Sequence, residues 1–239
     1  MFASVVTVRL AGYALVAALL VVLAAALGVG LPDLAALRLD PVRLLADLAA
    51  SLARTGTAVV TAWLAGLAGG YVLHARPLAR QLALPLINFL RSVSPFAWLP
   101  FAVVWFGLGE APVAFVLVVA LVFPALVAAA DAFANLEREY VDEAQVLGAG
   151  RWRMLHDVKL PLAAPALLSH LRVLWGLGWS TVVAAEMLGV DSGLGFRLLD
   201  FRYLVQYPPM LVYVAVMGAV GIVVDQGLRV WCGRVDRAR

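Results

Sequence analysis

The strongest constraint in this 239-residue chain is a series of long apolar runs. A helix needs roughly 20 apolar residues to cross the hydrocarbon core of a bilayer, because each residue adds about 1.5 Å. Six runs satisfy this requirement, and charged residues, Pro or Gly separate them. Their approximate limits are residues 10–31, 55–73, 82–106, 112–130, 161–190 and 208–231. The pattern predicts an all-α membrane protein with six transmembrane helices.

The composition agrees with a membrane protein and excludes two other classes. Hydrophobic residues make up 64% of the chain and charged residues 14%, and the mean hydropathy is +0.96. Soluble domains carry about 25% charged and roughly 45–50% apolar residues, and a soluble fold of this size could not bury so large an apolar share. Intrinsically disordered chains have the opposite composition. The single cysteine, Cys232, excludes an intrachain disulfide.

The distribution of basic residues predicts how the helices are oriented. Cytoplasmic loops of membrane proteins carry an excess of Lys and Arg. With the N-terminus inside, the cytoplasmic side receives 11 of the 18 Lys and Arg residues and the outer side receives five. We therefore expect both termini, and the polar loop between the fourth and fifth runs, to lie in the cytoplasm.

The chain divides into three regions. Residues 1–54 hold the first run and an outer amphipathic segment, in which leucines recur at helical spacing. Residues 55–231 form a core of five further membrane helices, including the polar loop 131–161, and residues 232–239 form a basic cytoplasmic tail. The first run exceeds the ~7–15 apolar residues of a signal peptide, and no small-residue cleavage site follows it, so we interpret it as a membrane helix.

Small residues four apart predict close helix contacts within two of the runs. Such residues let helix backbones approach one another in a membrane. Packing within the chain is the simpler interpretation, and a dimer contact is the alternative. The two sets are Ala62, Gly66 and Gly70, and Gly176, Ser180 and Ala184.

Signatures of catalysis are absent from the sequence. It has no Gly-x-x-x-x-Gly-Lys-Ser/Thr phosphate loop, no His-Glu-x-x-His pair and no Cys/His zinc spacing, and its three histidines are scattered. We therefore expect no catalytic residue, metal or cofactor on this chain. Inverted repeats or paired acids within the runs would favour a self-sufficient secondary transporter or channel. A cluster of His, Asp, Glu, Ser or Lys would favour a membrane-embedded enzyme; neither pattern is visible.

The loop 131–159 holds the densest group of acidic and basic residues in the chain. Apolar residues three or four apart predict a short helix over 136–147, and acidic residues favour its first turns. Gly148 and Gly150 are expected to end that helix, and a second one follows over 151–158. The loop is then either a helix–turn–helix that fits a groove on another protein, or a loop that contacts only solvent.

This loop resembles the EAA loop of ABC-importer permeases, whose pattern is Glu-Ala-Ala-x3-Gly-x9-Ile-x-Leu-Pro. The resemblance places a coupling helix-turn-helix between the fourth and fifth membrane helices. Asp, Glu and Val replace the family's first Glu, first Ala and Ile, while every spacing is kept. The matching positions are Asp142, Glu143, Ala144, Gly148, Val158, Leu160 and Pro161.

Other segments are similar to the nitrate, sulfonate and taurine branch of these permeases. They follow one another in the order found in that branch, over about residues 50–230. The segments are Leu90–Pro95, Leu99–Pro100, Trp105–Gly109, Val183–Glu186 and Ser192–Gly195.

The resemblance implies a non-catalytic subunit of an ATP-driven importer in the bacterial inner membrane. In such importers two permease subunits, here a homodimer, enclose a central pathway, and a separate cytoplasmic ABC ATPase binds ATP and Mg. An external substrate-binding protein, periplasmic or lipid-anchored, delivers the substrate, which in this branch is a small anion such as a sulfonate, taurine or nitrate. The implied ATPase-coupling residues are Tyr140, Asp142, Glu143, Ala144, Leu147, Gly148, Trp152 and Pro161.

Charged residues and prolines within the runs predict the translocation pathway. Glu186 lies in the apolar stretch 181–190, where an ionisable group is costly and usually faces a partner or a cavity. Arg91 is an available counter-charge for a gating or structural ion pair; alternatively, Glu186 meets water at the outer interface. Prolines in the third run break its helix, which is tolerated where a span lines a cavity. The predicted pathway or gate residues are Arg91, Ser92, Ser94, Pro95, Pro100 and Glu186.

Overall fold

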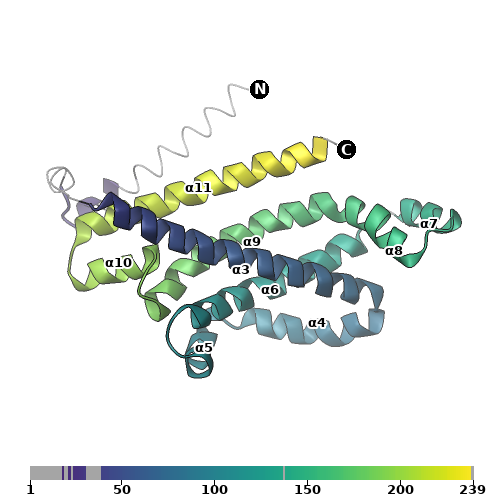
Figure 1. The fold of residues 1–239 in the computed structure, drawn as a ribbon, viewed down its shortest axis with the longest axis horizontal. Helices are drawn as coiled ribbons and strands as arrows, with labels where there is room; N and C mark the ends of the chain where they lie inside the picture. Colours follow the sequence, from purple (N-terminus) through teal and green to yellow (C-terminus); the bar gives the residue numbers. More distant parts are fainter. Residues whose placement is uncertain (1–17, 19–20, 23, 31–38, 137, 238–239) are drawn as a thin grey trace.

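The computed structural model describes residues 18, 21–22, 24–30, 39–136 and 138–237. From residue 39 onward it is helical apart from short connections, as the sequence predicts, and the long helices lie side by side (Figure 1). Helix α10 lies at one end of the bundle, and α7 and α8 lie at the other (Figure 1). The elements are α3 (Pro41–Ala75), α4 (Pro77–Ser92), the 3₁₀-helix η1 (Pro95–Trp98), α5 (Leu99–Phe106), α6 (Glu110–Ala134), α7 (Arg138–Val146), α8 (Arg151–Arg153), the π-helix η2 (Met154–Lys159), α9 (Leu160–Gly189), α10 (Leu194–Tyr203) and α11 (Tyr207–Arg237).

Within the described residues, four helical segments are long and apolar enough to cross a membrane. They are α3, α6, the continuous segment Arg151–Gly189 and the Tyr207–Gly233 part of α11. A fifth candidate is the pair formed by α4 and residues 95–106, which is bent by 90°. These segments correspond to five of the six predicted runs. The first run, residues 10–31, lies largely outside the described residues.

Helix α3 is longer than the second predicted run. It begins at Pro41, where the Asp40 side chain caps it by accepting a hydrogen bond from the Val42 N–H at 3.0 Å. The predicted outer surface segment is therefore, from residue 41 onward, the first part of a 35-residue helix, and the predicted boundary at residue 54 falls inside it. The interpretation failed because it assigned the polar side of this segment to water. Instead Asp47 is buried.

Small residues bring α3 and α6 into close contact. A Cβ atom on Gly66 would lie 2.5 Å from the Ala125 Cβ, and one on Gly70 would lie 2.6 Å from the Ala129 Cβ. Real atoms do not approach so closely, so these positions accept only glycine unless the helices separate. The predicted packing within the chain is confirmed for this set.

The second set of small residues behaves differently. Nothing lies within 4 Å of the Cβ position of Gly176, and Ser180 is exposed. The prediction that this set packs inside the chain is therefore wrong for Gly176 and Ser180, whereas Ala184 is half-buried. This side of α9 therefore presents a strip of small and polar residues on the outside of the single chain.

The third predicted run is broken at Ser94 and Pro95. Proline disfavours the helical region for the residue before it, and Ser94 has φ −56° and ψ +130°. The chain then turns through η1 into α5 and leaves a 90° bend after α4. The other two prolines do not break a helix. Pro100 lies in the first turn of α5, where no N–H is needed, and α4 continues through Pro85.

The loop between α6 and α9 contains the predicted short helix, as α7, but the second predicted helix does not end before Leu160. Instead α8 continues through η2 into α9 as one segment. Pro161 sits in the first turn of α9 and has no N–H to donate. The π-helix η2, whose hydrogen bonds span five residues, comes just before Pro161. The helix therefore continues through the proline without ending.

Candidate coupling surface and buried charge network

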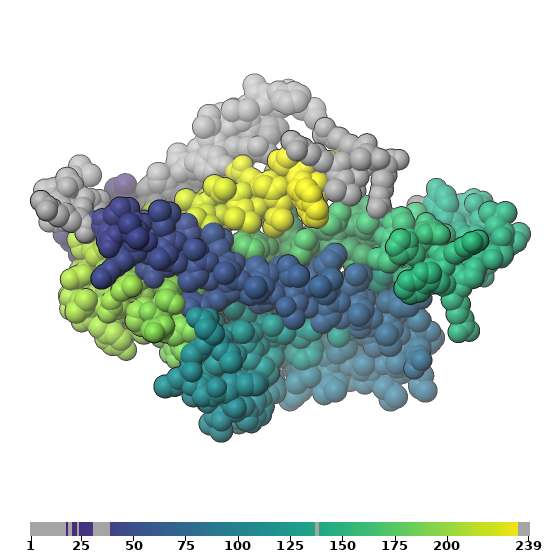
Figure 2. Space-filling model, in the orientation of Figure 1, coloured from purple at the N-terminus to yellow at the C-terminus, as the bar shows by residue number. Residues whose placement is uncertain are grey.

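Residues 138–153, here called the knob, protrude from one end of the molecule (Figure 2). The knob comprises α7, a four-residue turn and α8. Three of its apolar side chains face outward, since Val146 is 88% exposed, Leu147 86% and Trp152 75%. Exposed apolar groups on a projecting element mark an interaction surface more often than a solvated loop.

The turn of the knob depends on Gly148. The Gly148 N–H donates to the Gln145 carbonyl and the Ala149 N–H donates to the Ala144 carbonyl, both at 3.0 Å. This pair of bonds is the Schellman motif, in which the first residue beyond the helix adopts a left-handed conformation. Gly148 has φ +79°, which a residue with a side chain adopts only at a cost. The predicted helix-ending role of this glycine is confirmed.

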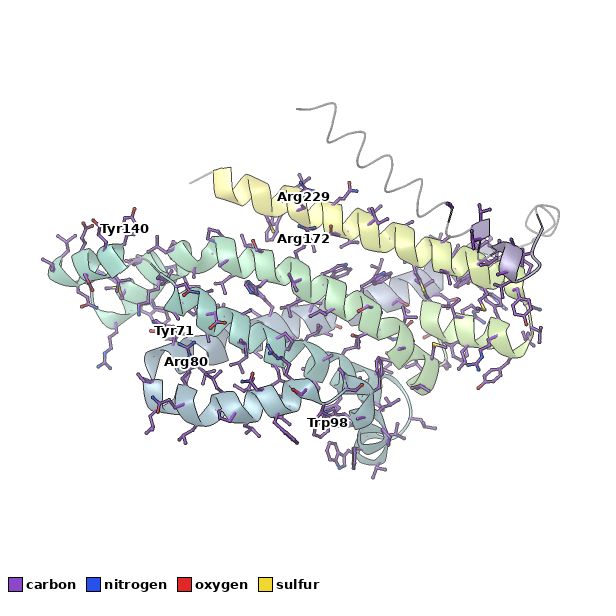
Figure 3. The ribbon with its side chains drawn as sticks, turned by 180° about the vertical axis from the view of Figure 1, so that it is seen from behind. Tyr71, Arg80, Trp98, Tyr140, Arg172 and Arg229 are labelled. Atoms are coloured by element: carbon purple, nitrogen blue, oxygen red, sulfur yellow. The ribbon has the colours of Figure 1, made fainter. Side chains whose placement is uncertain are left out.

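The other predicted coupling residues also lie on or near the knob. Tyr140, Asp142 and Glu143 are exposed on α7, and Ala144 is half-buried. Pro161 is also half-buried but lies beyond η2, at the base of the knob. Figure 3 shows Tyr140 at this end of the molecule.

One polar contact joins the base of the knob to α3, and another joins α4 to α6. The Lys159 Nζ of η2 lies 3.2 Å from the His74 Nε2 near the end of α3. Arg80 on α4 donates to Asp131 on α6 at 3.2 Å. The knob is therefore attached at its base, while its tip makes few contacts with the rest of the chain.

At the opposite end of the molecule, Glu186 is completely buried. Its carboxylate accepts hydrogen bonds from the Ser51 hydroxyl at 2.8 and 2.9 Å, the Arg54 Nη1 at 2.7 Å and the Gly195 N–H at 2.9 Å. A buried carboxylate is tolerated when it is paired and hydrogen-bonded in this way. Glu186 therefore connects α9 to both α3 and α10.

Arg54 joins Glu186 to two further groups. Its Nε donates to the Glu110 carboxylate at 2.7 Å, and its Nη1 and Nη2 donate to the Ser192 carbonyl and hydroxyl at 2.8 and 2.7 Å. The guanidinium thus bridges the buried carboxylate of α9 and the exposed carboxylate at the start of α6. All three of its nitrogens are engaged.

A second buried carboxylate, Asp47, extends the cluster toward α11. It accepts hydrogen bonds from the Arg197 Nε and the Tyr213 hydroxyl, both at 3.1 Å, and from the Gly193 N–H at 3.2 Å. Burial alone would lower the pKa of Arg197, but its hydrogen bonds with Asp47 and Asp200 raise that pKa above its ordinary value. Asp47, Ser51, Arg54, Glu110, Glu186, Ser192, Arg197 and Tyr213 are here called the buried network.

The buried network satisfies the N-terminus of α10. The first N–H groups of a helix have no partner within it. Here Gly193 donates to Asp47, Leu194 donates to Ser51 and Gly195 donates to Glu186. Side chains from two other helices therefore cap α10 and fix where it lies.

Two glycines are required for this arrangement. Gly193 has φ +105°, and a Cβ there would lie 2.4 Å from the Glu186 Oε1. A Cβ on Gly195 would lie 2.1 Å from the Val183 carbonyl oxygen. The two sequence segments singled out above, Val183–Glu186 and Ser192–Gly195, therefore form one structural unit.

The structure corrects the prediction for Glu186. Its counter-charge is Arg54 and not Arg91, which lies exposed at the end of α4. Glu186 also does not meet water, because none of it is exposed. Sequence reasoning missed Ser51 and Arg54, although polar residues at positions 47, 51 and 54 recur at helical spacing, which was the available signal.

The remaining predicted pathway residues lie together and take no part in the buried network. They cluster at the bend between α4 and α5, where Arg91, Ser92, Ser94 and Pro100 are exposed and Pro95 is half-buried. The Ser92 hydroxyl donates to the Asn88 carbonyl of its own helix at 2.8 Å. Figure 3 shows Trp98 beside this bend. The bend thus presents polar groups on the outside of the single chain.

The sequence profile of one protein family, the binding-protein-dependent transport system inner membrane component, matches residues 58–235. This chain belongs to that family. The matched residues include the knob and Glu186, whereas Asp47, Ser51 and Arg54 precede them. The resemblance inferred from the sequence is therefore confirmed.

Curated relatives of this transport component include permeases for two different solutes. The taurine transport system permease protein TauC of Escherichia coli (strain K12) is 35% identical over 182 residues, which are 76% of this chain and 66% of TauC. The bicarbonate transport system permease protein CmpB of Synechocystis sp. is 29% identical over 181 residues, which are 75% of this chain and 64% of CmpB. The chain spans just under two thirds of the length of these two relatives.

Solved structures share its fold. An inward-facing structure of the MetNI methionine ABC transporter has a TM-score of 0.71 at 18% identity and covers 83% of this chain and 99% of that one. A crystal structure of an amino acid ABC transporter with histidines has a TM-score of 0.63 at 16% identity and covers 85% and 100%. The chain is thus a multi-pass membrane component of a transport system with an ABC-permease fold.

Proposed function

We propose that the chain is the translocation subunit of an ATP-driven importer and docks through its knob onto a separate ATPase. The observation that carries this proposal is a projecting helix–turn–helix with exposed Val146, Leu147 and Trp152, in a member of a transport family. The proposed ATPase is cytoplasmic and binds ATP and Mg. An external substrate-binding protein, periplasmic or lipid-anchored, delivers the substrate.

The chemistry of the knob supports docking into a groove. Burying a large apolar side chain contributes about 1.5–3 kcal/mol, so covering these three side chains would favour docking. The exposed carboxylates of Asp142 and Glu143 lie on α7, which also carries Val146, and they would orient the contact. The remaining predicted coupling residues, Tyr140, Ala144, Gly148 and Pro161, would shape or support this surface.

The proposed orientation places the knob and both termini in the cytoplasm. The excess of Lys and Arg on that side supports it. The buried network then lies at the outer end, and residues 10–31 provide the first of six spans. The importer operates in the bacterial inner membrane.

The proposed functional unit is a homodimer that encloses the pathway. The polar bend after α4 lies on the outside of the single chain, where a second copy could cover it. In such a pair Arg91, Ser92, Ser94, Pro95 and Pro100 would line the pathway. Glu186 then has a structural role beside the pathway, since it is sealed inside one chain.

The proposed substrate is a small anion such as a sulfonate, taurine or nitrate. The relative TauC, named for taurine transport, is 35% identical to this chain and supports this class. Bicarbonate, named for the relative CmpB, is also a small anion. The choice among these anions depends on the binding protein as well.

The proposal is tested by purifying the chain from its native membranes and identifying by mass spectrometry what accompanies it. We expect an ATPase and, in proteoliposomes that contain both proteins and the binding protein, uptake that requires ATP. A chain that purifies alone and moves solute without ATP would instead be a self-sufficient secondary transporter or channel.

A matched pair of variants tests the knob itself. Gly148→Val forces a β-branched residue into the left-handed region, at a cost of at least about 1–2 kcal/mol. We expect it to reduce ATPase co-purification several-fold. Gly150→Val adds the same side chain two residues away, where φ is −64° and space is open, and should leave co-purification unchanged. Equal recovery of the ATPase with both variants would contradict docking through the knob.

A further inference from the structure

A groove of about 640 Å³ separates α9 and α11 in the half of the bundle nearest the knob. Arg172 on α9 and Asp225 on α11 form a bidentate ion pair across it, with side chains 41% and 42% exposed. Arg229, one turn further along α11, is exposed on the same groove. Figure 3 shows Arg172 and Arg229 at the same level of the α9–α11 pair.

The position of this groove along α11 places it at the edge of the bilayer. Along α11, Asp225 lies about 27 Å and Arg229 about 33 Å from Tyr207, at 1.5 Å per residue. The hydrocarbon core is about 30 Å thick. If Tyr207 marks the outer boundary, Arg229 lies at the level of the inner-leaflet headgroups, and Arg172, paired with Asp225, lies just inside the hydrocarbon edge.

The groove has an excess of positive charge. Among the described residues that line it, the charged ones are two arginines and one aspartate. The pair with Asp225 engages the Arg172 Nε and Nη2, so Arg172 Nη1 and the Arg229 guanidinium are the donors outside that bidentate contact. A guanidinium fork fits a phosphate or carboxylate bidentately.

An apolar surface continues from the groove toward the middle of the membrane. Val173 and Leu177 on α9 are exposed, as is Ile222 on α11, one turn before Asp225. A ligand that uses both parts has an anionic head and long apolar tails. A small soluble anion would contact only the guanidinium groups.

We propose that this groove binds the headgroup phosphate of an anionic phospholipid of the cytoplasmic leaflet, with the acyl chains lying along Val173 and Ile222. Basic pockets between membrane helices on the cytoplasmic side are known to bind such headgroups. Asp225 holds Arg172 in place and weakens the site by its own charge. This proposal rests on the orientation proposed above but not on the substrate or on ATP.

The test is native mass spectrometry of the detergent-purified full chain, titrated with phosphatidylglycerol or phosphatidylcholine. We expect wild type to retain phosphatidylglycerol preferentially. Because each basic residue near a membrane surface contributes about 1 kcal/mol, Arg229→Gln should weaken phosphatidylglycerol binding about fivefold. Arg202→Gln, at an exposed arginine of α10 at the far end, is the matched control and should leave binding unchanged.

Asp225→Asn separates a lipid site from a purely structural ion pair. It removes the carboxylate that competes for Arg172, so phosphatidylglycerol should bind more tightly than to wild type. Equal retention of both lipids by wild type, or an unchanged affinity in Arg229→Gln and Asp225→Asn, would overturn the proposal. Displacement of the lipid by millimolar inorganic phosphate or taurine would also overturn it and assign the groove to a soluble anion. None of these results depends on whether the chain imports a solute.

Discussion

At the α10 end of the molecule, carboxylates and a guanidinium lie inside the fold, whereas at the knob end the large apolar side chains lie outside it. The buried network ties α3, α9, α10 and α11 together, and most of its polar atoms have partners. The knob is held by one turn and by contacts at its base. Buried polar groups are costly to separate, and exposed apolar groups gain by finding a partner. One end is thus built to stay assembled and the other to bind.

The largest effect is expected from Arg54→Met, which removes the counter-charge of Glu186. A buried charge that loses its partner costs about 3–5 kcal/mol, so the free energy of unfolding should fall by that amount and thermal unfolding in detergent should occur at a lower temperature. The matched control is Arg91→Met, at the exposed end of α4, with an expected change below about 0.5 kcal/mol. Similar losses in both variants would show that Glu186 does not depend on Arg54.

The next effect tests the conformation of the α10 cap. Gly193→Ala places a Cβ against Glu186 at a φ that only glycine adopts readily, which costs about 1–3 kcal/mol before the clash is counted. Gly227→Ala is the control, since Gly227 lies in α11 with open space around its Cβ position, and it should stabilise the helix by roughly 0.5–1 kcal/mol. Thermal unfolding of the two variants should therefore shift in opposite directions. A shift in the same direction would mean that the cap tolerates a side chain.

At the knob the expected effect is on binding and not on folding. Leu147→Asp should leave thermal unfolding unchanged, because the side chain is already exposed. Its apolar contribution to docking, about 1.5–3 kcal/mol, would be lost, so affinity for the co-purifying ATPase should fall roughly ten- to a hundredfold. Leu147→Met keeps the apolar surface and should bind nearly as wild type. A stability loss in Leu147→Asp would place this side chain in the fold.

The smallest effect sharpens the contrast between exposed and buried ion pairs. Arg43 and Asp40 are 3.5 Å apart and largely exposed, so Arg43→Gln should change the free energy of unfolding by no more than about 0.5 kcal/mol. Arg197→Gln removes the same type of charge from the buried Asp47 and should cost several times more. Denaturation in detergent measures both. Equal costs would indicate that water reaches Asp47.

The knob could be predicted from sequence because its determinants are local. Acidic first turns, Gly148 and apolar spacing all lie within about 20 residues, and α7 forms where they indicated. The continuity of α8 with α9 was missed, because a π-helix before Pro161 has no pattern that separates it from a helix end.

The buried network could not be predicted in the same way. Its contacts join residues far apart in the chain, such as Ser51 with Glu186 and Asp47 with Tyr213. Helical spacing puts Ser51 and Arg54 on one side of a helix, but it does not say whether that side faces water or protein. In a membrane the lipid-facing side is apolar, so the polar side turns inward. Because the sequence interpretation turned the polar side of this segment toward water, it placed the first part of α3 on the surface. For the same reason it paired Glu186 with the wrong arginine.

The unbroken segment from Arg151 to Gly189 has a mechanical consequence. Its 39 residues form a continuous helical arm about 58 Å long, with the knob at one tip and Glu186 near the other. A tilt of about 10° around the knob end would sweep the far tip through roughly 10 Å, whereas a hydrogen bond tolerates a stretch of only a few tenths of an ångström. Because Glu186 is bonded to α3 and α10, these helices must travel with α9 as one block or release it.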